Sequence, residues 1–374
     1  MRCDCHSART ILTAILVVFA LTGTARAYEV RAFQGKSRKA VVADFSPHGD
    51  RSENKVNKFY GEQYSFDNSP QGGGNLWFQI FISNMGVKNG RAALLVNFTP
   101  PGGKKITTRQ VFDAGNWSYS VAGETLTMTL GASTFSGDGS AWKAHMETGD
   151  FVADCAITNS APAWRPGGGM AYYGAGEKSY YGVTLLTPRG HFEATVKGEA
   201  VGEHSLAGLT YGDHSVINVS PNLQAHRWIR MRDVGKSRTV LLTVLETSEE
   251  YGQKWIGWFV VADDKRIQVT AANPTLELSD FEKDPKNGYE VPKAVLVTGA
   301  PGVDSLMGAI KAQKRKRRQD KLADLSTLEK AVVSKLIQPF SYTYKAAFEF
   351  QYNRNGKGRT IKGRTSYHFE QITK

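Results

Sequence analysis

The stretch LWFQIFIS, residues 76–83, alternates two kinds of side chain. Leu76, Phe78, Ile80 and Ile82 form a purely apolar set, and the residues between them form a mixed set. A period of two is typical of a β-strand that turns one face to a core. This stretch therefore predicts a half-buried strand.

The same pattern recurs along the whole chain. Short runs rich in Val, Ile, Thr and aromatic residues alternate with clusters of Gly, Asn, Asp and Pro, as expected of strands and turns. We expect strands at 58–66, 76–83, 91–98, 106–112, 125–130, 141–147, 151–158, 180–186, 191–198, 204–211, 227–233, 239–247, 254–263, 266–270, 290–298, 342–352 and 360–372. The predicted fold class is mainly β.

The segment NSAPAWRPGGG, residues 159–169, is the densest cluster of turn residues after the first thirty positions. It predicts a linker at 161–169 between an N-terminal β domain, 28–160, and a C-terminal β domain, 170–374. Each part is of ordinary domain size.

The first 27 residues have the order of a secretory signal peptide. Arg2 and Arg9 precede an uncharged apolar run at 11–21, and Ala25-Arg26-Ala27 follows it. We expect cleavage near Ala27 and a periplasmic or secreted protein; the alternative is an uncut leader that anchors the chain. Cys155 is then the one cysteine of the mature chain, and we expect it to be a packing residue rather than a nucleophile.

The formal net charge is +12. In an exported protein this charge favours anionic lipid headgroups or acidic envelope polymers and argues against nucleic acid as a partner.

Helical spacing of apolar residues predicts one long helix from Asp304 to Ile337, late in the second domain. Its middle is strongly basic. We expect Lys314, Arg315, Lys316, Arg317 and Arg318 to bind headgroups or an acidic surface; the alternative is a solvated face that only keeps the protein in solution.

The segment GLTYGDH, residues 208–214, is the most informative motif. On a strand, Tyr211 and Asp213 share one face, with His214 opposite or at the rim. At a barrel mouth such a pair could protonate an alkene or bind a headgroup; alternatively Asp213 ties a turn and Tyr211 packs. Four aromatic residues are candidates for lining a ligand cavity: Tyr180, Trp228, Trp255 and Trp258.

Other motifs are absent from the sequence. The glycines at 167–176 do not have the spacing of a phosphate loop, and neither G-x-S-x-G nor H-E-x-x-H occurs. His191, His204, His214 and His226 do not pair at metal-binding intervals. We expect no metal and no cofactor.

Four strings carry a resemblance to a known family: FQIFISNMG at 78–86, GLTYGDH at 208–214, RWIRMR at 227–232 and WIGWFVVAD at 255–263. They resemble the tandem lipocalin-like (calycin) family that includes fungal survival-factor proteins and bacterial carotenoid hydratases. The resemblance implies two consecutive lipocalin-like antiparallel barrels and long apolar ligands such as carotenoids and sphingolipids. It carries the hydratases' acid role to Tyr211 and Asp213, although Ser215-Val216-Ile217 replaces the Asn-Trp or Asn-Phe expected after the His.

The expected function is therefore an exported lipocalin-like protein that binds or carries a lipid or other long apolar molecule in the cell envelope. The alternative is an isoprenoid or lipid hydratase, isomerase or cyclase that uses the acid pair, with His214 nearby, at the mouth of the second barrel. A third possibility is a protein that binds acidic polymers through its charge alone.

Overall fold

The computed structural model describes residues 28–48, 57–84, 89–299, 305–323, 330, 333–334, 337–354 and 356–373. The signal peptide predicted for residues 1–27 lies outside these ranges. No helix within the ranges has both the length and the apolar character needed to cross a bilayer. Strands dominate, so the mainly β prediction is confirmed.

The described residues form two antiparallel sheets. The first has 15 strands, and its continuous path is β6 (Ile106–Phe112), β5 (Arg91–Thr99), β4 (Asn75–Ser83), β3 (Gly61–Pro70), β15 (Gly202–Ile217), β14 (Tyr180–Gly198), β11 (Val152–Asn159), β10 (Ala141–Glu147), β9 (Ser133–Gly137), β8 (Thr125–Leu130) and β7 (Trp117–Ala122). Four short strands pair off this path: β1 (Val30–Arg31), β2 (Arg38–Lys39), β12 (Trp164–Arg165) and β13 (Met170–Tyr173).

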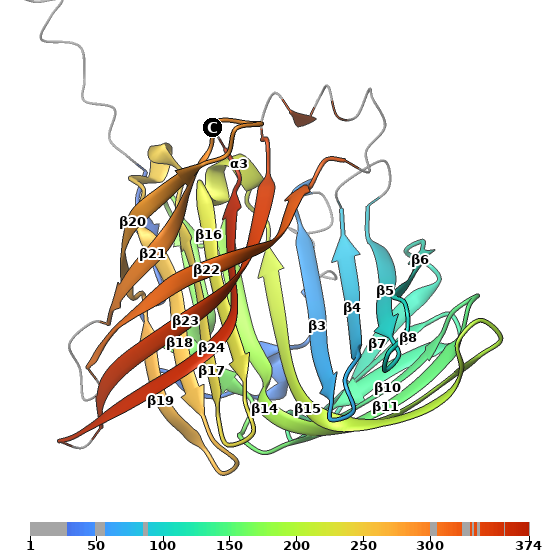
Figure 1. The fold of residues 1–374 in the computed structure, drawn as a ribbon. Helices are drawn as coiled ribbons and strands as arrows, with labels where there is room; N and C mark the ends of the chain where they lie inside the picture. Colours follow the sequence, from blue (N-terminus) through green and yellow to red (C-terminus); the bar gives the residue numbers. More distant parts are fainter. Residues whose placement is uncertain are drawn as a thin grey trace, which may run out of the picture.

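The second sheet has 9 strands in the described ranges. Their order is β19 (Ile267–Ala272), β18 (Trp255–Ala262), β17 (Thr239–Glu246), β16 (Arg227–Val234), β24 (Lys357–Gln371), β23 (Phe340–Arg354), β22 (Leu306–Asp320), β21 (Glu290–Thr298) and β20 (Thr275–Lys283). One sheet is nearly closed into a barrel and the other curls into a half-barrel, side by side in Figure 1. Helical pieces are single turns at Val42–Asp44, Pro166–Gly169, Glu249–Tyr251 and α3 (Pro221–Gln224).

The sheets divide the chain later than the sequence suggests. β14 and β15 pair with β11 and β3 of the first sheet, so the division falls after Ile217 rather than at 161–169, where β12 and a 3-10 turn lie. The strands expected at 180–186 and 191–198 are one strand, β14, with register shifts between Leu185 and Gly190. Turn residues mark a local change of direction, whereas strand pairing is decided over long range.

The predicted long basic helix is wrong. Residues 306–320 form β22, which pairs with β23 from Leu306↔Tyr352 to Asp320↔Phe340. Register shifts between Ala312 and Lys314 and between Arg315 and Arg317 interrupt the alternation, so the period of two is hidden in the sequence. Pairing with a long neighbouring strand overrides the local helical preference. Of the rest of the predicted helix, Asp304 and residues 324–329, 331–332 and 335–336 are outside the described residues, and residues 321–323 form a turn.

Three apolar clusters hold the structure together. The first sheet encloses a core rich in aromatic rings, in which Phe135 stacks on Trp142 at 5.3 Å. The second sheet encloses another, in which Phe259 and Phe350 are 4.9 Å apart. A third cluster, here called the seam, packs one sheet against the other through Tyr181, Leu185, Tyr211, Leu245, Trp258 and their neighbours. Cys155 is buried in the first core, and its burial raises the pKa of the thiol to about 12, so its predicted packing role is confirmed.

A buried arginine also joins the sheets. Arg189 on β14 is fully buried and reaches the β16–β17 turn. Its guanidinium donates to the carbonyls of Gly235 and Lys236, both at 2.7 Å, and to Asp264 Oδ1 at 2.6 Å. Because a buried cation is tolerated only when its donors are paired, this contact fixes the relative position of the sheets.

Candidate functional site

Tyr211 and Asp213 lie on the face of β15 that turns toward the second sheet. The Tyr211 hydroxyl donates to Asp213 Oδ2 at 2.6 Å, and the two residues are only 1% and 8% exposed. Burial, followed by the charge of Asp213, raises the pKa of Tyr211 well above its ordinary value. The shared face agrees with the strand prediction. The pair belongs to the first sheet and lies between the two sheets, not at the mouth of a second barrel.

Arg232, on β16 of the second sheet, contacts both members of this pair. Its guanidinium carbon lies 4.6 Å from the centre of the Tyr211 ring, and Nη2 lies 3.4 Å from Asp213 Oδ2. Its Nε atom is buried and has no hydrogen-bond partner among the described residues. This arginine therefore links the pair to the second sheet.

Arg232 also lines a groove of about 440 Å³, which we call the inter-sheet groove. The strand register builds it: Trp228, Arg230 and Arg232 share one face of β16, opposite the β24 residues Glu370, His368 and Ser366, while Ile229 and Met231 point into the core. The complete lining is Asp67, Trp228, Arg230, Arg232, Lys321, Ser341, Ser366, His368 and Glu370.

The inter-sheet groove is polar and rich in cations. The Arg230 guanidinium stacks over the Trp228 ring at 4.7 Å. Burial, then repulsion from Arg232, Arg230 and Lys321, lowers the pKa of His368 to about 4. Three nearby cations contribute to this low imidazole pKa, which indicates a positive local potential. Such a potential favours hydrogen-bond acceptors and anions.

His214 lies on the opposite face of β15, inside the first sheet. Its Nε2 is 2.6 Å from Glu62 Oε1, and its ring stacks on Tyr64 with centres 4.4 Å apart. Burial alone would raise the pKa of Glu62, but hydrogen bonds from His214 and His48 hold it well below its ordinary value. The predicted trio of Tyr211, Asp213 and His214 is thus divided between two sites.

The four predicted ligand-binding aromatics are also separated. Trp228 lines the inter-sheet groove and packs edge-on against Tyr181, with ring centres 5.6 Å apart. Tyr180 lies in the core of the first sheet, Trp258 is buried in the seam, and Trp255 is half-buried with the Arg227 guanidinium 5.8 Å from its ring centre. Sequence reasoning missed Arg230, Arg232 and His368 as site residues, although the alternation in RWIRMR signals a polar face on that strand.

The basic run of β22 is divided into paired and unpaired residues. Arg318 Nε is 2.5 Å from Asp284 Oδ2, and Arg315 Nη1 is 3.5 Å from Glu282 Oε1. Lys314, Lys316 and Arg317 are exposed and form no ion pair with the residues that the structure describes. Repulsion, chiefly from Lys345, lowers the pKa of Lys316.

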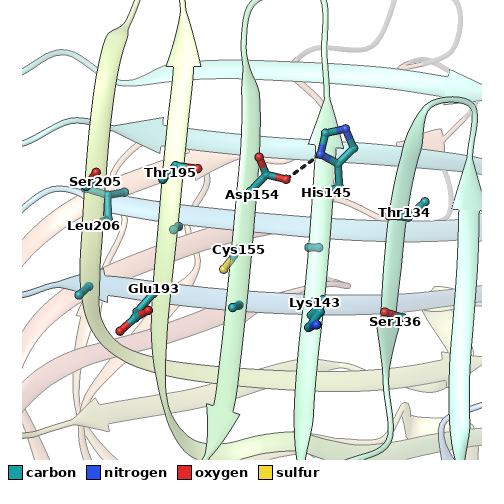
Figure 2. A pocket seen from close by; sticks show the side chains of 14 residues that line it. Thr134, Ser136, Lys143, His145, Asp154, Cys155, Glu193, Thr195, Ser205 and Leu206 are labelled. Atoms are coloured by element: carbon teal, nitrogen blue, oxygen red, sulfur yellow. Dashed lines mark hydrogen bonds and ion pairs between the residues drawn. The ribbon is translucent and has the colours of Figure 1, made fainter.

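A second groove, of about 760 Å³, lies on the outer face of the first sheet across β9, β10, β11, β14 and β15 (Figure 2). Its lining is mostly small side chains. Its His145 Nδ1 is 2.7 Å from Asp154 Oδ1, an exposed pair. None of the predicted site residues lines this groove, and its charged groups face bulk water, so we do not assign a site to it.

The low pKa of His368 should make the free energy of unfolding depend on pH. Between pH 6.5 and about 4 the unfolded chain binds a proton at this position and the folded protein does not, so stability falls as the pH falls through this window. We expect the loss of unfolding free energy between pH 7 and pH 4.5 to be smaller by about 2 kcal/mol in His368→Gln than in the unmodified protein. Denaturant unfolding at the two pH values measures this loss. The exposed His191→Gln is the control; an unchanged pH dependence in His368→Gln would contradict the assignment.

Comparisons with known proteins agree with this fold. A ceramide-binding protein SVF1 from Candida albicans is 22% identical over 207 residues, which are 52% of this chain and 53%, about half, of that relative. An AttH protein from Nitrosomonas europaea matches over 88% of this chain and 98% of its own, with TM-score 0.50 and 14% identity. The crystal structure of CghA matches over 92% of this chain and 98% of its own, with TM-score 0.54 and 10% identity. The family model of Svf1 matches residues 52–372, so the tandem lipocalin-like resemblance is confirmed and the chain belongs to the Svf1 family.

Proposed function

We propose that this protein binds a lipid of the sphingolipid class and holds its polar headgroup in the inter-sheet groove. The observation that carries the proposal is the set of donors that converge there: Arg230, Arg232 and Lys321, beside the Trp228 ring. The name of the Candida albicans relative, a ceramide-binding protein, supports the lipid class. The leader predicted at residues 1–27 would place this binding in the periplasm or outside the cell.

The groove offers what a headgroup needs. Guanidinium and ammonium groups donate strongly to phosphate, hydroxyl and carbonyl oxygens. Trp228 adds an apolar surface at the edge of the seam. Because the aromatic residues inside the first sheet pack on one another, we assign the ligand to the space beside the seam rather than to the interior of that sheet.

Arg230→Gln tests the headgroup site. It removes a charged donor that lines the groove and should weaken binding of ceramide 1-phosphate by about tenfold, the value of one charge-assisted hydrogen bond, with a smaller effect on ceramide. Fluorescent-ceramide displacement measures both affinities. The control is Arg109→Gln, an exposed arginine on β6.

Two results would contradict the headgroup site. One is equal affinity of Arg230→Gln and the unmodified protein for both lipids. The other is the same loss of affinity in Arg109→Gln.

We also propose that the outer face of β21 to β24 docks on an anionic membrane. Leu296 and Met307 are 37% and 55% exposed there, in a groove of about 520 Å³ whose lining also includes Lys311, Arg364 and the Lys362–Glu349 ion pair of 3.2 Å. The unpaired Lys314, Lys316 and Arg317 continue along β22. Apolar side chains among cations form an amphipathic surface, and each basic residue near such a membrane gains about 1 kcal/mol.

The triple change Lys314→Gln, Lys316→Gln and Arg317→Gln should reduce binding to phosphatidylglycerol vesicles by about 100-fold, from about 3 kcal/mol of lost attraction. Vesicle co-sedimentation at low and moderate salt measures it. The matched control removes three exposed lysines, two just before β6 and one on β10: Lys104→Gln, Lys105→Gln and Lys143→Gln. Equal losses in both triples would show that net charge alone, not this face, mediates binding.

A second candidate function is an isoprenoid or lipid hydratase, isomerase or cyclase. The 2.6 Å hydrogen bond between Tyr211 and Asp213, buried beside the inter-sheet groove, favours it, because a buried hydroxyl–carboxyl pair can transfer a proton to an alkene before water adds to the cation. Arg232 lines the groove and contacts both groups.

Asp213→Asn separates catalysis from binding. If the pair is catalytic, the unmodified protein converts an unsaturated isoprenoid lipid to a hydrated or rearranged product, and the variant loses turnover while it retains the lipid. Product formation is followed by mass spectrometry, with the exposed Asp154→Asn as control. Equal turnover by Asp213→Asn, or none by the unmodified protein, would remove this candidate.

A further inference from the structure

Three segments that are far apart in the sequence bring metal-binding groups together inside the first sheet. His48 follows the 3-10 turn at Val42–Asp44, Glu62 lies on β3, and His214 lies on β15. One potential ligand atom from each lies within 4.8 Å of the other two. The sequence predicted no metal because only the spacing of His191, His204, His214 and His226 was considered; His48 and Glu62 are far from His214 along the chain.

The strand register explains the juxtaposition. β3 and β15 are antiparallel neighbours, in which His214 pairs with Tyr64 and Val216 pairs with Glu62. Glu62 and His214 are therefore diagonal neighbours on the same inward face. His214 Nε2 lies 2.6 Å and His48 Nδ1 lies 3.3 Å from the same oxygen, Glu62 Oε1.

We propose that His48, Glu62 and His214 form a binding site for one divalent transition-metal ion, with Zn²⁺ as the best match. Two imidazole nitrogens and one carboxylate oxygen are a donor set that zinc sites use, with bonds of about 2.0–2.2 Å. Such bonds separate neighbouring ligand atoms by about 3.3 Å, so small side-chain shifts of the observed groups would suffice.

The surrounding residues orient these ligands. The hydroxyls of Tyr60 and Tyr64 donate to Glu62, the latter at 3.4 Å, and the backbone N–H of His48 donates to Glu62 Oε2 at 2.9 Å. Tyr64 also donates to the carbonyl of Phe45 at 2.9 Å and stacks on His214. Partners of this kind fix the orientation of a ligand and are a regular feature of metal sites.

Burial indicates a structural role for the ion. Glu62 and His214 are 0% and 1% exposed, and His48 is 8% exposed at the open side of the cluster. An ion here would tie the segment before β3 to the β3–β15 pair, next to the strand that carries Tyr211 and Asp213. This role does not depend on the proposed lipid binding, so either proposal can fail alone.

The competing explanation is a hydrogen-bonded network that holds Glu62 without an ion. Metal titration separates the two. Chelator-treated protein should bind one Zn²⁺ per chain by calorimetry, Co²⁺ should give the visible absorption bands of nitrogen and oxygen ligation, and Zn²⁺ should raise the melting temperature. His48→Gln and His214→Gln should each weaken Zn²⁺ binding by about 10- to 100-fold.

The control is His145→Gln, which changes an exposed histidine beside Asp154 and should leave Zn²⁺ binding intact. His48→Gln, at the edge of the cluster, keeps the test valid if His214→Gln fails to fold, and circular dichroism checks both variants. The proposal is overturned if the unmodified protein binds no stoichiometric Zn²⁺ or Co²⁺, or if folded His48→Gln binds Zn²⁺ as tightly as the unmodified protein.

Discussion

Side chains of a β-strand point alternately to its two faces, and in β15 both faces are covered. Tyr211 and Asp213 face the seam, whereas His214 and Val216 face the core of the first sheet. A register slip of one residue would place the carboxylate in the core and the imidazole in the seam. Pairing with β14 shifts register between Leu185 and Gly190, but pairing with β3 is unbroken from Gly208 to Ile217 and prevents that slip, so both candidate sites depend on the β3–β15 register.

A fully buried arginine, Arg189, and a half-buried one, Arg232, lie at or near the seam and determine how the sheets meet. Arg189 and Arg232 approach the seam from opposite sheets, and each reaches acceptors on the other one. An uncompensated buried charge costs several kcal/mol, so few relative positions of the sheets satisfy both arginines. The inter-sheet groove is lined by strands of the second sheet and by Lys321, with Asp67 of β3 as the contribution of the first sheet. A fixed position of the two sheets therefore fixes its shape, as a specific polar site requires.

Many strand positions were predictable because they depend on local alternation: 76–83 corresponds to β4 and 227–233 to β16. No strand was predicted at β7, β9 or β20. Local sequence patterns were insufficient where long-range strand pairing determines the structure. Residues 306–320 form a strand that pairs with β21 on one side and β23 on the other. The turn at 159–169 lies within the first sheet because β14 and β15 return to β11 and β3. The candidate sites show the same limit. The sequence places Tyr211 and Asp213 on one face, but only the register reveals that Arg230 opposes His368 and that Glu62 lies beside His214.

The charge of the inter-sheet groove bears on what it can select. The groove is lined by three cations, Arg230, Arg232 and Lys321, and by two carboxylates, Asp67 and Glu370. Its formal net charge is therefore 3 − 2 = +1. His368, with a pKa of about 4, adds no charge at neutral pH. A balance this small attracts anions only weakly over long range, so selectivity must come from directional hydrogen bonds at short range. Such bonds contribute most when the donors are already held in place, as Trp228 holds Arg230 and as Tyr211 and Asp213 hold Arg232. If the groove holds a headgroup as we propose, it would distinguish headgroups by the position of their oxygens more than by their total charge.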